Sequence, residues 1–144
     1  MRRAANALHG RVGRRGSALL AFAALDTAYG LRLATARPDS NTLYAWLHGP
    51  VPLWPWAALW AVVAVVCAGG AVRGKDRVAF VAAISIKVLW CSLYLCGWLL
   101  GELPDGWVSA AVWGAFALIV GLIAGWPEPI DSGEGRPAWT PPLE

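Results

Sequence analysis

Residues 78–101 read VAFVAAISIKVLWCSLYLCGWLLG, an apolar run interrupted by a single charge at Lys87. About 20 such residues, folded as an α-helix, cross the roughly 30 Å hydrocarbon core of a bilayer. Similar runs occupy residues 17–35, 56–72 and 106–126. The 144-residue chain is 58% hydrophobic and only 15% charged, so a water-soluble domain would leave most of these runs exposed. The sequence predicts an all-α integral membrane protein built on a four-transmembrane-helix bundle.

The runs divide the chain into a basic segment at residues 1–16, a membrane domain at 17–126 and a tail at 127–144. Helices are favoured over the strands of a membrane barrel, because the apolar runs are continuous and show no two-residue alternation. The tail combines five prolines with a net acidic charge. Such a composition cannot bury a core, so we expect the tail to be disordered.

Basic residues flank the runs unevenly. Lys and Arg close to a span are retained on the cytoplasmic side of a membrane. The opposite side has only Arg37, so the bias predicts an inner or plasma membrane protein with both termini in the cytoplasm. The residues that set this bias are Arg2, Arg3, Arg11, Arg14 and Arg15 before the first run, and Arg73, Lys75 and Arg77 between the second and third.

The first run has an alternative reading as a secretory signal, because the small-residue triplet Ala34-Thr35-Ala36 resembles a cleavage site. Cleavage there would leave three spans. Asp26 and Arg32 count against this alternative, since they interrupt the uncharged core that a signal requires.

The first outer loop, residues 36–55, is predicted to contain a short interfacial helix. Ser40 or Asn41 can cap this helix, which would continue through Trp46 and end at Gly49. Trp side chains favour the headgroup layer, so the loop reads as part of an aromatic belt, with a substrate-binding gate as the alternative. The belt would include Trp54, Trp56, Trp98 and Trp107.

Asp26 and Lys87 are the charges that most need an explanation. Even on lenient scales, a charge near the bilayer centre costs at least about 2.5 kcal/mol. Each is the tenth residue of its run, and the first and third runs cross in the same direction, so the two lie at matched depth. An intramembrane ion pair follows, either as a structural clamp or as a proton or ion relay.

Polar residues near this pair could line a wet crevice. Tyr29 and Arg32 continue the stripe of Asp26, while Cys91 and Tyr94 continue that of Lys87. Arg32 could instead extend outward to the lipid headgroups.

Glycines on the last run, Gly114, Gly121 and Gly125, lie on nearly the same face and allow another helix to approach closely. They are interpreted as helix-packing residues that serve either dimerisation or packing against the second run. The second-run partners would be Cys67, Ala68, Gly69 and Gly70.

Several kinds of chemistry are not expected. His9 and His48 fall on opposite sides of the membrane, and no metal-binding or dithiol spacing occurs, so we expect no metal, no cofactor and no enzymatic activity. Nucleic-acid binding is disfavoured, because no aromatic residues are interleaved with the N-terminal arginines. The expected partners are the lipid bilayer and either copies of the same chain or another membrane protein.

Three functions fit these features. The first is a non-enzymatic structural or accessory membrane subunit, favoured by a self-satisfied ion pair and a proline-rich tail that can dock partners. The second is an oligomeric pathway or small transporter for protons or ions. The third is a phage-type holin, suggested by the small size, the charged cytoplasmic ends and the packing glycines.

Overall fold

The chain folds into α-helices alone within the residues that the structure, a computed structural model, describes: 2–37, 40–74 and 76–127, with side chains from residue 13 onward. The prediction of an all-α protein is therefore confirmed for this part of the chain. Its helices are α1 (Arg2–Thr35), α2 (Thr42–His48), α3 (Leu53–Arg73), α4 (Arg77–Leu99) and α5 (Gly106–Ala124). The tail predicted to be disordered falls, from residue 128 on, outside the described residues.

Three of these helices are long and apolar enough to cross a membrane. They are α3, α4 and α5, with 21, 23 and 19 residues. Their ends lie within three residues of the predicted spans, as expected from the length of each apolar run. α1, which contains the predicted first span, is not among the three, because Asp26 and Arg32 lower its apolar character. The fourth span and the membrane depth of α2 stay predictions.

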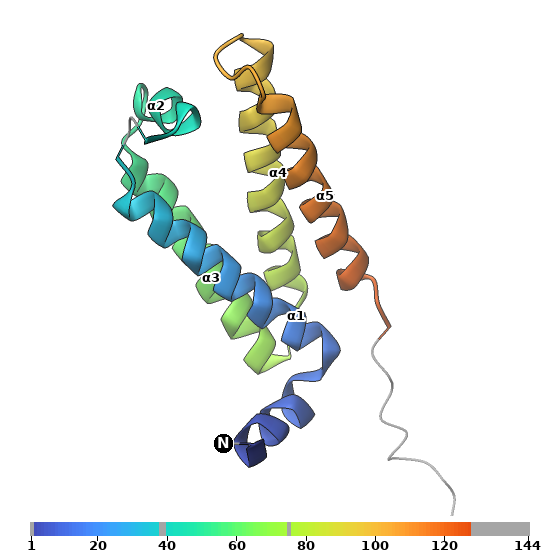
Figure 1. Ribbon diagram of the computed structural model, residues 1–144. Helices are drawn as coiled ribbons and strands as arrows, with labels where there is room; N and C mark the ends of the chain where they lie inside the picture. Colours follow the sequence, from blue (N-terminus) through green and yellow to red (C-terminus); the bar gives the residue numbers. More distant parts are fainter. Residues whose placement is uncertain (1, 38–39, 75, 128–144) are drawn as a thin grey trace, which may run out of the picture.

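α1 is kinked at Gly13. Its φ of 58° and ψ of 177° interrupt the helical backbone, and a positive φ of this kind is accessible mainly to glycine. The kink turns the basic first part of α1 away from the axis of the longer part that follows (Figure 1).

α2 is the short helix predicted in the outer loop. Asn41 adopts an extended conformation, and its side chain accepts a hydrogen bond from the Leu43 N–H at 2.9 Å. This is the N-cap geometry that satisfies a free amide of the first turn. Leu43, Tyr44 and Leu47 are buried, so the apolar face of α2 covers the end of the bundle.

The helices pack as two antiparallel pairs, α1 with α3 and α4 with α5 (Figure 1). The start of α1, the turn between α3 and α4, and the end of α5 lie at one end of the molecule. α2 and the turn between α4 and α5 lie at the other (Figure 1). The backbones of α1 and α4 stay apart, and the two helices contact each other through side chains. This spacing leaves room for large residues between the α1–α3 pair and the α4–α5 pair.

The α5 glycines correct one expectation about packing. A Cβ added at Gly114 would lie 3.5 Å from the Cys91 Sγ, and one at Gly121 would lie 4.0 Å from the Ile84 Cδ1. Both neighbours belong to α4, so the suggested partner face on α3 around Cys67 is wrong. The misassignment has a physical cause, because glycine spacing shows where close approach is possible but does not identify the partner. At Gly125 an added Cβ would meet only carbonyls of its own helix, and dimerisation stays a prediction.

Gly106 supports a testable prediction about the turn between α4 and α5. An added Cβ would lie 2.7 Å from the Tyr94 carbonyl oxygen and 2.9 Å from the Trp98 Cβ. Because a backbone atom cannot move aside locally, we expect Gly106→Ala to lower the free energy of unfolding by about 1–3 kcal/mol in a detergent titration.

Gly125→Ala is the matched control for this prediction. Its added Cβ would have ordinary contacts at 3.5 Å, and its backbone is right-handed helical. The substitution should therefore leave stability unchanged or raise it by about 0.5–1 kcal/mol through reduced chain entropy. Equal losses in the two variants would contradict the close approach at Gly106.

Candidate functional site

The structure brings Asp26 of α1 and Lys87 of α4 into one ion pair, with the Lys87 Nζ donating to the Asp26 Oδ1. Both side chains are 0% exposed. They meet because both helices run the same way, and Asp26 lies near the middle of the part of α1 that follows Gly13 while Lys87 lies near the middle of α4. A buried pair of this kind holds two helices together, since removing either partner leaves an uncompensated charge.

Aromatic rings complete the surroundings of Lys87. Its Nζ lies 5.3 Å from the centre of the Trp60 ring and 5.8 Å from that of Phe22. The negative faces of such rings stabilise a desolvated ammonium. Among the residues that the structure describes, the second carboxylate oxygen of Asp26 has no hydrogen-bond partner. The pair is thus supported mainly by mutual attraction and by π-electrons.

A cluster of four aromatic residues, Tyr29, Trp60, Trp90 and Trp113, lies next to the ion pair. We call it the aromatic core. Ring centres are 4.5 Å apart for Tyr29 and Trp60, 5.2 Å for Trp60 and Trp90, and 5.2 Å for Tyr29 and Trp113. The Trp90 Nε1 donates to the Tyr29 hydroxyl at 2.8 Å. Since the four residues come from α1, α3, α4 and α5, this cluster joins all four long helices.

Sequence reasoning missed three members of this core: Trp60, Trp90 and Trp113. It placed Trp54, Trp56, Trp98 and Trp107 in an outer belt. Trp54, Trp98 and Trp107 are indeed exposed, whereas Trp56 is half-buried, with its ring centre 5.8 Å from that of Trp90. A usable signal was present, because Trp90 lies three residues after Lys87 and therefore shares its helix face.

Three of the four residues predicted to line a crevice, Tyr29, Arg32 and Tyr94, lie near one another and near Tyr44. Tyr29 belongs to the aromatic core, and Cys91 lies beside Gly114. Arg32 donates from its Nε to the Tyr44 hydroxyl of α2 at 3.2 Å, so its polar head has a protein partner. Tyr94 also lines a cavity between α2, α4 and α5.

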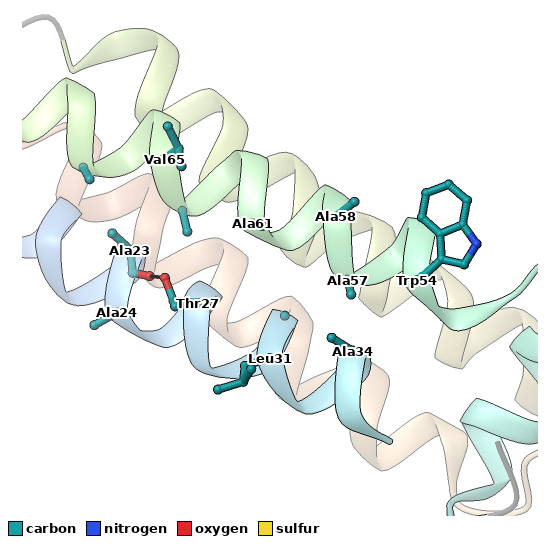
Figure 2. Close-up of a pocket in the computed structure, with 13 residues that line it drawn as sticks. Ala23, Ala24, Thr27, Leu31, Ala34, Trp54, Ala57, Ala58, Ala61 and Val65 are labelled. Atoms are coloured by element: carbon teal, nitrogen blue, oxygen red, sulfur yellow. Dashed lines mark hydrogen bonds between the residues drawn. The ribbon is translucent and has the colours of Figure 1, made fainter. Parts of the chain in front are cut away.

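A groove of about 720 Å³ runs along α1 and α3 (Figure 2). Small side chains on both helices form it, most of them alanine. The Thr27 hydroxyl is already bonded to the Ala23 carbonyl at 2.7 Å, so the groove surface is apolar. Its lining residues are Ala23, Ala24, Thr27, Gly30, Leu31, Ala34, Trp54, Ala57, Ala58, Ala61, Ala64, Val65 and Ala68.

Comparison with known proteins gave a single result. No protein-family model, curated protein or solved structure matches this chain. Within the described residues, no group of three or more His, Cys, Asp or Glu side chains is placed to hold a metal ion, and Cys67, Cys91 and Cys96 are free thiols. The ion pair, the aromatic core and the cavities are the features of this chain that bear on its function.

Proposed function

We propose that this chain is a four-span membrane protein that acts as a non-enzymatic structural or accessory subunit. Three helices have the length and composition of membrane spans. The observation that carries the proposal is the enclosed Asp26–Lys87 pair, because a charge pair sealed inside a bundle stabilises one arrangement of helices and offers no entry to a solute.

α1 is proposed as the fourth span. The part from Arg14 to Thr35 is about 33 Å long at roughly 1.5 Å per residue, which matches a bilayer core. Its two inner charges have partners, since Asp26 pairs with Lys87 and Arg32 bonds to Tyr44. A charge that has a partner costs less free energy to place in a bilayer. This supports α1 as a span that lies in the membrane as part of the bundle.

The proposed orientation puts both termini in the cytoplasm. The end of the molecule that carries the start of α1 and the end of α5 also carries Arg14, Arg15, Arg73 and Arg77, which lie at the adjoining ends of α1, α3 and α4 (Figure 1). Arg15 is part of this end through an ion pair, with its Nε 2.8 Å from the Asp76 Oδ2. A concentration of basic residues at one end favours its retention inside the cell.

A structural clamp explains the pair better than a relay does. A relay needs polar groups or water on both sides of the ionisable residues. Toward the end that holds the start of α1, the buried side chains on these faces are apolar: Leu19 and Ala23 on α1, and Phe80 and Ala83 on α4. Toward the other end, the Tyr29 hydroxyl accepts from the Trp90 Nε1, so polar groups continue on one side of the pair and not on the other.

Membrane potential during timed expression tests this choice. We expect no depolarisation from the intact chain or from an Asp26→Asn, Lys87→Gln variant, provided that both insert equally. Depolarisation by the intact chain alone would indicate an ion pathway through the pair. Depolarisation by both would indicate hole formation of the holin type, and either result would contradict the subunit proposal.

A second experiment looks for the complex itself. Extracted from its native membrane in a mild detergent, an accessory subunit should migrate with another membrane protein at a fixed ratio, measured by cross-linking and mass spectrometry. Migration only as a monomer or only as copies of this chain would contradict the proposal.

A further inference from the structure

Four arginines gather at the end of the molecule where α1 starts, α3 turns into α4, and α5 ends (Figure 1). They are Arg14 and Arg15 of α1, Arg73 of α3 and Arg77 of α4. We call this surface the basic end. Among the described residues it contains one acid, Asp76, whose Oδ2 already lies 2.8 Å from the Arg15 Nε.

The other three guanidiniums of the basic end have no acid partner among the described side chains. Arg14, Arg73 and Arg77 are all exposed. Arg73 lies back along its own helix, with its Nη1 3.9 Å from the position that a Cβ on Gly69 would take. Like charges on one surface repel each other and attract an anionic partner. Arginine suits a carboxylate in particular, because its planar group can donate two parallel hydrogen bonds.

The chain itself carries acids directly after this surface. Residues 128–134 read EPIDSGE, with carboxylates at Glu128, Asp131 and Glu134 and no basic residue among them. These residues lie outside the described part of the chain, but their starting point is known. α5 ends at Ala124, and the described chain continues from there to Pro127.

The packing of α5 on α4 brings the first of these acids level with an arginine. Gly114 lies beside Cys91, and Gly121 lies beside Ile84. From the first contact to the second, α5 advances by seven residues and α4 goes back by seven. A further seven residues in each direction lead to the first acid on one side and to Arg77, the start of α4, on the other.

The acids of this stretch recur at every third residue. An extended polyproline II chain has three residues per turn and rises about 3.1 Å per residue, so such acids would fall on one face, about 9 Å apart. The proline after the first acid favours this conformation. Packed helices lie about 8–10 Å apart, and the exposed arginines belong to α1, α3 and α4. One row of carboxylates can therefore meet guanidiniums on more than one helix.

We propose that residues 128–134 dock on the basic end through ion pairs between their carboxylates and Arg14, Arg73 and Arg77. Because these residues follow α5 directly, the local concentration of their carboxylates at this surface is high. The contact is exposed and electrostatic, so its strength falls with added salt. While docked, the segment keeps the arginines from other anionic partners, among which an anionic lipid surface is the main competitor. The docking depends neither on the subunit role nor on the membrane orientation proposed above.

A carbodiimide tests the contact in the full chain, because it joins a carboxylate to a neighbouring amine as an amide, with loss of water. The sequence has two lysines, Lys75 and Lys87, and Lys87 is 0% exposed, so Lys75 is the lysine that can react. In phosphatidylcholine nanodiscs that each hold one chain, we expect mass spectrometry to identify a link from Lys75 to Glu128 or Asp131. In about 1 M salt, where the screening length is about 3 Å, the yield should fall at least about threefold.

The double variant Arg73→Gln, Arg77→Gln should lower this yield by at least about threefold, as expected for the loss of two exposed ion pairs. Both side chains are exposed, so the fold should persist. Arg37→Gln is the matched control, because Arg37 is an exposed arginine that follows α1 at the opposite end, and it should leave the yield unchanged. Acylation of Lys75 by a neutral ester, at equal rates in all chains, checks that its amine is equally reactive.

Equal yields from the double variant and from Arg37→Gln would overturn the proposal. So would the absence of a link in the intact chain. If the intact chain then retained phosphatidylglycerol through purification and the double variant did not, the basic end would bind an anionic lipid in place of the acidic segment.

Discussion

Replacing Lys87 with methionine is expected to lower the free energy of unfolding by about 3–5 kcal/mol, because Asp26 would remain buried without its partner. Methionine is similar in length to lysine, so the loss of stability would come mainly from the missing charge and not from a cavity. The effect is large because both side chains are 0% exposed and water cannot solvate the remaining carboxylate. Reversible unfolding in mixed micelles measures it.

The double variant Asp26→Leu, Lys87→Met distinguishes the interaction between the two side chains from the contribution that each makes by itself. Removing both charges leaves no unpaired charge in the interior, so the double variant should lose less stability than Lys87→Met alone. Arg77→Met is the matched control on the same helix, because Arg77 is exposed and should change stability by less than about 0.5 kcal/mol. If the double variant lost as much stability as Asp26→Leu and Lys87→Met lose in sum, the two residues would not be in contact and the ion pair would be contradicted.

Trp90→Ala is expected to lower the free energy of unfolding by about 3–5 kcal/mol. Trp90 is 0% exposed, and its ring centre lies 5.2 Å from that of Trp60 and 5.7 Å from that of Tyr29. Lipid is as apolar as a core, so the loss comes from the cavity and from broken contacts rather than from transfer out of water. The same unfolding assay measures it.

Two further variants control for this second prediction. Trp54→Ala removes a side chain that is 70% exposed, so it should have little effect on stability. Trp90→Phe keeps a ring but removes the donor to the Tyr29 hydroxyl, so an intermediate loss of about 1–2 kcal/mol is expected. Similar losses for Trp90→Ala and Trp54→Ala would mean that the aromatic core does not hold the helix pairs together.

Local features were predictable from the chain because their causes are local. Apolar runs of span length produced α3, α4 and α5, and Asn41 capped α2 through an amide that lies two residues away. Asp26 and Lys87 could be paired by counting residues along two helices that run in the same direction, because the distance along a helix axis is proportional to the number of residues. Their roles, and the orientation in the membrane, stay predictions.

The sequence by itself thus determined the apolar helices, the matched positions of Asp26 and Lys87 along two of them, and the need for a partner at each buried charge. Only the tertiary structure decided that α1 packs on α3 and α5 on α4, and that Trp60, Trp90 and Trp113 point inward instead of joining the belt. It also set the register of α5 against α4, with Gly114 beside Cys91 and Gly121 beside Ile84. The physical reason is that an apolar membrane helix has no polar stripe to distinguish its inward face from its lipid face, so packing alone selects its neighbours.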